Sequence, residues 1–153
     1  MTKAGMATVL VAASVAAVVA LDAAAQAKPE VLVKQRQAGM TLIGKYFGPL
    51  GGMAQGKLPY NAQVVQRNAG YLEVLSKLPW DGFHESTRGT KSAALPAVFQ
   101  KQSEFKQGAE RMQSEVSKLA SVSKSGDEAA VKAQIGAVGK TCGGCHDNFR
   151  EKR

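Results

Sequence analysis

The sequence predicts an all-α protein that folds as an antiparallel up-and-down four-helix bundle. Four stretches carry apolar residues at the spacing of an amphipathic helix, and glycine, proline and serine gather between them. Because shortish loops join the helices, each helix is expected to run antiparallel to its neighbour in the chain. The chain is long enough to form one such domain around a single core.

The first helix is expected to begin at Pro29, since proline suits a first helical turn, and to end near Phe47, before Gly48-Pro49. The apolar stripe of this helix contains Met40, and Arg36 lies in the same stripe one helical turn earlier. A guanidinium in an apolar stripe either reaches solvent from the edge of the bundle or needs an anionic partner. Arg36 is therefore a candidate binding residue.

The second helix is expected to follow Asn61, a candidate N-cap after a loop over residues 51–60, and to end near Leu78. Residues 79–95 have no clear period and form the longest irregular segment. A third helix follows Pro96. Its predicted seam consists of apolar residues at bundle spacing: Val98, Phe105, Ala109, Met112, Val116 and Leu119.

The fourth helix is expected to start at the capping box that Ser125-Gly126-Asp127-Glu128 offers. Its predicted buried positions are Val131, Ile135, Val138, Cys142, Cys145 and Phe149. Both cysteines thus extend the core stripe, which places them in the interior of the bundle.

The two cysteines belong to the motif Cys142-Gly143-Gly144-Cys145-His146, and the sequence has no other cysteine. This is the spacing of a haem c attachment site. On a helix the three side chains lie on one side of about one turn, so two thioethers and an imidazole can reach the same porphyrin. We therefore expect one haem c near the C-terminal end of the fourth helix, with His146 as the axial iron ligand.

Three other interpretations of the cysteine pair are weaker. A thioredoxin-like redox couple needs a βαβ context, and no strand-like alternation lies nearby. A zinc site would need four ligands and would have to combine the cysteines with His84 and His146, the latter too close to Cys145 for an easy tetrahedron. A disulfide between Cys142 and Cys145 would close a very small loop that restrains little.

Residues 1–27 are predicted to be a cleaved signal peptide. They combine Lys3, an apolar run over residues 7–21 and the small-residue cleavage signature Ala25-Gln26-Ala27. A membrane-spanning helix is the weaker interpretation, because the run is short and ends at Asp22. Cleavage leaves residues 28–153 as the bundle domain. Since haem c is assembled outside the bacterial cytoplasm, we expect a soluble periplasmic protein without a membrane span after cleavage.

The formal net charge of +8 admits nucleic acid, anionic lipid or an acidic protein as a partner. Export argues against nucleic acid. Most lysines are spread over helical faces, so solvation accounts for most of the charge.

The chain resembles cytochrome c′, a class II c-type cytochrome, over the whole of its mature part. The resemblance rests on Arg36-Gln37-Ala38-Gly39-Met40, on Leu78-Pro79-Trp80, and on the C-terminal position of the cysteine motif, which Phe149-Arg150 follows. It implies that Cys142 and Cys145 hold the haem covalently and that His146 binds its iron. The four-helix bundle is the fold that such a resemblance also implies.

The resemblance implies further roles around the haem. Arg36 and Gln37 match residues beside the haem propionates, and Met40 matches a bulky distal residue that covers the open iron face without binding it. Arg150 matches a basic residue near the proximal histidine. Thr87 lies in the loop that approaches the haem, which is a weaker match.

The function expected from this resemblance is that of a haem protein with five-coordinate, high-spin iron. It would act in electron transfer, bind nitric oxide and carbon monoxide, or both, and it would not be an enzyme. One alternative is a six-coordinate, low-spin electron carrier in which Met40 is the sixth ligand. Another is a peroxidase-like enzyme, for which His84 would be the only spare histidine.

The relatives that the resemblance implies form homodimers by crossing their first two helices. Leu42 and Tyr71 are candidates for such a contact. The sequence does not identify a redox protein partner.

Overall fold

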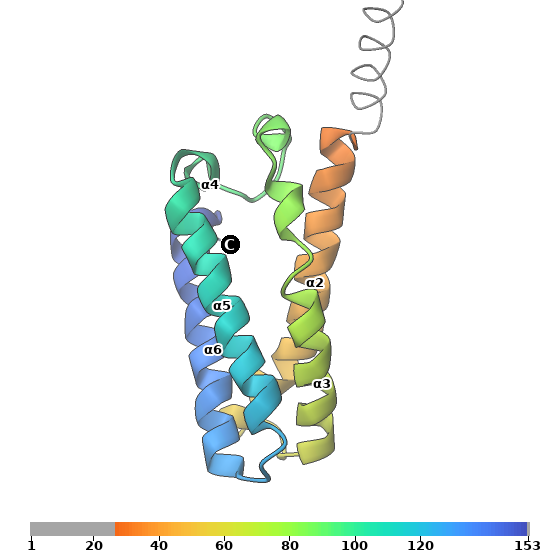
Figure 1. The fold of residues 1–153 in the computed structure, drawn as a ribbon, viewed down its shortest axis with the longest axis vertical. Coiled ribbons are helices and arrows are strands. Elements are labelled where there is room, and N and C mark those ends of the chain that lie inside the picture. Colours follow the sequence, from red (N-terminus) through yellow and green to blue (C-terminus); the bar gives the residue numbers. More distant parts are fainter. Residues whose placement is uncertain (1–26, 153) are drawn as a thin grey trace, which may run out of the picture.

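The computed structural model describes residues 27–152 and shows a bundle of long helices (Figure 1). The helical elements are α2 (Pro29–Ala54), α3 (Ala62–Leu75), the 3₁₀ turns η1 (Trp80–Phe83) and η2 (Glu85–Thr87), α4 (Ala97–Gln100), α5 (Gln102–Val122) and α6 (Glu128–Phe149). The predicted signal peptide lies outside the described residues apart from Ala27. Its cleavage stays a prediction.

The four long helices form an antiparallel bundle, which confirms the predicted fold class. In Figure 1, α2 and α5 run downwards, while α3 and α6 run upwards. α2 packs against α3 and α6, and α5 packs against the same two helices. η1 and η2 lie against α2, so the segment after α3 continues along the bundle towards α4. None of the helices within residues 27–152 is long and apolar enough to cross a membrane.

α2 continues through Pro49 to Ala54, so its predicted end near Phe47 is wrong. A proline inside a helix removes one backbone hydrogen bond and costs roughly 3 kcal/mol. Leu50 and Met53 offset this cost because both are buried in the core, and each such burial contributes about 1.5–3 kcal/mol. The loop after α2 therefore starts at residue 55.

α3 begins where predicted, because the side-chain oxygen of Asn61 accepts a hydrogen bond from the Val64 backbone N–H at 3.0 Å. The helix ends at Leu75, three residues before the predicted end at Leu78. Pro79 explains the difference. It has no N–H to donate to the Leu75 carbonyl, and its ring disfavours a helical backbone at the preceding residue.

The predicted third helix is divided into α4 and α5. The backbone of Lys101 (φ −119°, ψ 49°) leaves the helical region between them. α4 buries both Val98 and Phe99. The rest of the predicted seam is confirmed on α5, where all members are buried except Phe105, which is half-buried.

α6 begins after Asp127, whose carboxylate accepts a hydrogen bond from the Ala130 backbone N–H at 3.0 Å. The N-cap is thus Asp127, and the predicted capping box that starts at Ser125 does not form. The Ser125 hydroxyl instead donates to the Val122 carbonyl at 2.8 Å, at the end of α5. The short aspartate side chain satisfies one of the free N–H groups of the first turn of α6.

The buried core is unevenly divided along the bundle. The larger cluster lies in the lower half of Figure 1, between α3, the second halves of α2 and α5, and the first half of α6. Its buried members are Leu50, Met53, Val65, Ala69, Leu72, Met112, Val116, Leu119, Ala120, Val131, Ile135 and Val138. The upper half has a second cluster with only three buried members, Val98, Phe99 and Phe149. The cysteine motif lies where α6 passes from the larger cluster to the smaller one.

Candidate functional site

The last turns of α6 present both cysteines and His146. Cys142 is half-buried and packs against the larger core cluster, whereas Cys145 is half-buried and packs against the upper cluster. His146 is exposed. Because positions three and four apart share a helix face, one turn of α6 offers two thiols and an imidazole together.

No disulfide joins Cys142 and Cys145, so both sulfur atoms are available for other bonds. Burial raises the pKa of each thiol above its ordinary value. Within residues 27–152, no three histidine, cysteine, aspartate or glutamate side chains are grouped so that they could hold a metal ion.

A surface groove of about 430 Å³ between α5 and α6 reaches one of the thiols. α5 contributes Gly108 and Arg111, while α6 contributes Lys140, Gly144 and Cys145. A Cβ added to Gly108 would lie 3.8 Å from the Cys145 sulfur. α5 thus leaves only van der Waals space beside Cys145, whose side chain lines the groove.

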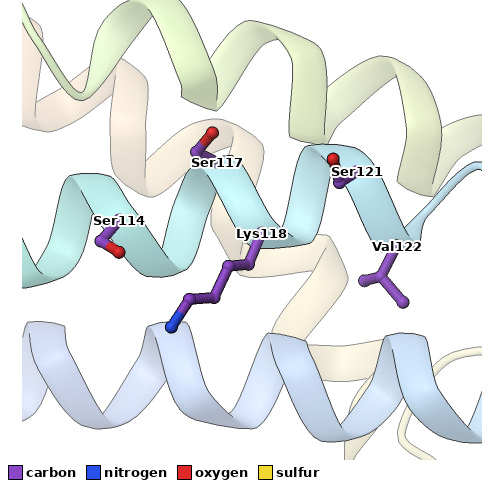
Figure 2. A pocket seen from close by; sticks show the side chains of 5 residues that line it. All are labelled: Ser114, Ser117, Lys118, Ser121 and Val122. Carbon is purple, nitrogen blue, oxygen red and sulfur yellow. The ribbon is translucent and has the colours of Figure 1, made fainter.

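A larger but shallow hollow of about 740 Å³ lies further along α5 (Figure 2). It is lined by Ser114, Ser117, Lys118, Ser121 and Val122. The ammonium of Lys118 pairs with a carboxylate oxygen of Glu115 at 2.7 Å. The hollow contains none of the predicted site residues, and we assign no function to it.

Arg36 is buried in α2, with only 3% of its surface exposed. Its Nη1 donates to the Gly82 carbonyl at 2.7 Å and to the Thr87 hydroxyl at 3.0 Å, and its Nη2 donates to the Ser92 hydroxyl at 2.8 Å. The ring of Phe83 lies 4.4 Å from its Cζ, in the geometry of a cation–π contact. The irregular segment after α3 thus holds the guanidinium that the sequence placed in an apolar stripe.

The acceptors around Arg36 are all neutral. Burial lowers the pKa of Arg36, but a guanidinium stays protonated at neutral pH. Its three hydrogen bonds use three of five N–H groups. The Nε–H and one Nη2–H have no acceptor among residues 27–152. Two such donors can serve the two oxygens of one carboxylate.

Thr87 contacts Arg36, although the sequence suggested only a weak role in binding. Its hydroxyl is buried and donates to the His84 carbonyl at 2.7 Å while it accepts from Arg36. A threonine hydroxyl has a single proton, and this one is already used. Thr87 therefore positions Arg36 and has no proton left to donate to another group.

Gly82 lies in close contact with α2. A Cβ added at this position would lie 2.6 Å from the Arg36 Cβ and 2.8 Å from the Leu32 carbonyl oxygen. Both neighbouring atoms are fixed by the backbone of α2, so only glycine fits. This close contact lets the Gly82 carbonyl reach the guanidinium.

Arg150 lies next to the same loop, directly after α6. It forms an isolated antiparallel bridge with Ala94. The Leu95 N–H donates to the Phe149 carbonyl at 3.0 Å, and the Glu151 N–H donates to the Ala93 carbonyl at 2.9 Å. The Nε of Arg150 is buried and has no hydrogen-bond partner within the described chain. An unpaired buried donor is costly in a folded protein.

Comparisons with known proteins identify the family to which this arrangement belongs. The sequence profile of the Cytochrome C' family matches residues 31–150. The chain belongs to the cytochrome c′ family.

Several cytochromes c′ are similar to this chain over nearly their whole length. Cytochrome c' from Rubrivivax gelatinosus is 41% identical over 126 residues, which cover 82% of this chain and 98% of the relative. Its crystal structure matches with a TM-score of 0.77 over 81% of this chain and 98% of the other. A nitric oxide complex of a mutant cytochrome c prime from Alcaligenes xylosoxidans, 36% identical, has a TM-score of 0.75 over 82% of this chain and 98% of that chain.

Proteins of the cytochrome c′ family carry a covalently attached haem c, which confirms the predicted cofactor. The residues present fit this group. One turn of α6 supplies two thiols and an imidazole, which are the donors that haem c needs. Arg36 has two N–H groups that donate to no acceptor within the described chain. The buried Nε of Arg150 also has no hydrogen-bond partner there.

In this cytochrome c′ fold, the other predicted residues are more exposed to solvent than Arg36. Gln37 is exposed, and Met40 is half-buried one turn after Arg36 on α2. His84 is exposed, and its Nδ1 accepts a hydrogen bond from the Ser86 backbone N–H at 3.2 Å. Its ring therefore caps η2.

Sequence reasoning missed three residues that surround Arg36: Gly82, Phe83 and Ser92. All three lie in the segment without a period, where spacing gives no information about which side chains face inwards. It also missed a chain of aromatic contacts in the upper half of the bundle. Ring centroids are 4.8 Å apart for Phe83 and Phe105, and 5.2 Å apart for Phe105 and Phe149.

Proposed function

We propose that the protein is a periplasmic c-type haem protein with five-coordinate, high-spin iron, which exchanges electrons, binds nitric oxide and carbon monoxide, or does both. The observation that carries this proposal is the presentation of Cys142, Cys145 and His146 on one turn of α6, beside a core cluster that has only three buried members. A haem supplies an iron that alternates between ferric and ferrous states and binds diatomic gases.

Cys142 and Cys145 would hold the group through two thioethers. In each, the sulfur adds to one carbon of a vinyl group, and the thiol proton goes to the neighbouring carbon. His146 would bind the iron through a ring nitrogen. Because all three residues belong to one rigid helix, the attachment fixes the position of the imidazole relative to the sulfur atoms.

Arg36 would donate its two unused N–H groups to a propionate. This interaction gives the buried cation the anionic partner that its neutral acceptors do not provide. Gln37, which is exposed, would lie on the propionate side as well, and Arg150 would lie on the side of His146, with which it shares a backbone hydrogen bond of 3.2 Å. Thr87 would act through Arg36.

Met40 would cover the open face of the iron without binding it. It lies one turn after Arg36, so an arginine at the edge of the haem places the thioether further inwards. An apolar cover gives bound dioxygen no hydrogen bond, which favours nitric oxide and carbon monoxide instead. The nitric oxide complex of a relative, a mutant cytochrome c prime from Alcaligenes xylosoxidans, supports nitric oxide as a ligand.

The absorbance and resonance Raman spectra of the reduced protein test the state of the iron. We expect a five-coordinate, high-spin spectrum that changes on addition of nitric oxide. Met40→Leu should leave the spectrum without ligand unchanged, because leucine preserves the volume and removes the sulfur. A low-spin spectrum that becomes high-spin in Met40→Leu would establish the alternative, a six-coordinate carrier with Met40 as the sixth ligand.

We propose no enzymatic activity. A peroxidase would need a distal acid–base group, and His84 is exposed and occupied with capping η2. The periplasmic location follows from the predicted signal peptide and the attachment motif.

We also propose a homodimer through α2 and α3. Leu42 on α2 and Tyr71 on α3 are 40% and 46% exposed, and the Tyr71 ring packs against Tyr46 with centroids 4.8 Å apart. The double variant Leu42→Glu, Tyr71→Glu should sediment as a monomer, because it places charges in an apolar contact. Leu58→Glu, at an equally exposed leucine outside these helices, is the control and should remain a dimer. A double variant that sediments like the wild type would contradict this interface.

A further inference from the structure

The hydroxyl of Ser92 differs from that of Thr87 in one respect. Thr87 uses its proton in a hydrogen bond to the His84 carbonyl. Ser92 accepts twice, from Arg36 Nη2 at 2.8 Å and from the Ala94 backbone N–H at 3.3 Å. A serine hydroxyl has two lone pairs and one proton, so both lone pairs of Ser92 are used. Its proton has no acceptor within residues 27–152.

The unused proton of Ser92 lies beside the unused donors of Arg36. The 2.8 Å bond joins the Ser92 oxygen directly to Nη2, the nitrogen that also has one free N–H. Three donors therefore gather at one place: the Nε–H and one Nη2–H of Arg36, and the O–H of Ser92. Each donor adds to the stabilisation of an ionised carboxylate.

We propose that Ser92 is a further haem-binding residue, which donates its hydroxyl proton to the same propionate as Arg36 and also holds the Arg36 guanidinium in place. This inference rests on the proposed haem site. It assigns different roles to two hydroxyls of one loop, because Ser92 contacts the carboxylate and Thr87 acts only through Arg36.

The loop holds Ser92 in position for this role. The Ala94 N–H bond fixes its oxygen, and the bridge between Ala94 and Arg150 ties the next residues to the end of α6. The same helix end bears the cysteine motif. A propionate would therefore be held by Arg36 on α2 and by a loop that is itself attached to α6.

The reduction potential of the haem-loaded protein tests the proposal. Removing a donor leaves more negative charge on the propionate, which favours the ferric state. Ser92→Ala should thus shift the ferric–ferrous equilibrium towards ferric, by less than the roughly two- to tenfold that a whole hydrogen bond is worth, because the bond forms in both oxidation states. Ser92→Thr keeps the hydroxyl and should restore the wild-type potential. Ser86→Ala, at an exposed serine of the same loop, is the control and should have no effect.

A double-mutant comparison separates direct contact from positioning. In an Arg36→Met background, Ser92→Ala should still shift the potential and the propionate bending band in the resonance Raman spectrum, whereas Thr87→Val should no longer do so. A potential unchanged by Ser92→Ala, or not restored by Ser92→Thr, overturns the role of Ser92. If Arg36→Met alone also leaves both readouts unchanged, the propionate contact of the proposed site fails as well.

Discussion

The double variant Cys142→Ala, Cys145→Ala is expected to lose all covalently bound pigment. Both thioethers form at these sulfur atoms, and the sequence contains no other cysteine that could replace them. Coordination by His146 would then be the only bond to the cofactor from α6. Acid–acetone extraction should remove the pigment completely from the double variant and leave it attached to the wild type.

The single variants are the matched controls for this experiment. Cys142→Ala and Cys145→Ala each keep one sulfur on α6, so each should retain a covalent adduct in the mass spectrum of the denatured chain. A double variant that keeps an added tetrapyrrole would contradict the attachment at these two positions. A wild-type chain without such an adduct would contradict the whole functional proposal.

Gly82→Ala is expected to destabilise the protein by roughly 2–3 kcal/mol, a cost in the range of overpacked interiors. The new Cβ would overlap with the Arg36 Cβ and the Leu32 carbonyl oxygen, so the loop must move away from α2. This movement also breaks the 2.7 Å bond between Arg36 and the Gly82 carbonyl. Urea denaturation measures the change in the free energy of unfolding.

Gly136→Ala is the control for the glycine substitution. Gly136 lies in α6, is exposed, and has no atom within 4 Å of an added Cβ. Alanine there should stabilise the protein by up to about 1 kcal/mol, because it favours the helix more than glycine does. Equal stability of Gly82→Ala and the wild type would show that the loop does not press against α2 as described.

The helices could be predicted from the sequence because their apolar spacing and their starting residues are local signals. Asn61 caps α3 as expected, and the seam of α5 is buried. The ends were less predictable. α2 passes through Pro49 because Leu50 and Met53 are buried against residues distant in the chain, which no local signal reveals.

The parts of the candidate site that could be predicted are those that a short sequence motif or a local pattern identifies. The cysteine motif gave the cofactor, and Arg36 stood out as a charge in an apolar stripe. The neighbours of Arg36 were not predictable, because Gly82 and Ser92 lie 46 and 56 positions away in a segment without a period. Thr87 was assigned to the haem only by resemblance, and the structure shows the hydrogen bond to Arg36 through which it would act.

The uneven core has a consequence for how the protein matures. The buried members of its larger cluster hold the lower ends of all four long helices together, and none of these members belongs to the last turns of α6. The smaller cluster at the opposite end has only three buried members, Val98, Phe99 and Phe149. Because the thiols of Cys142 and Cys145 are only half-buried, we expect haem to be attached after the helices have assembled around the larger cluster.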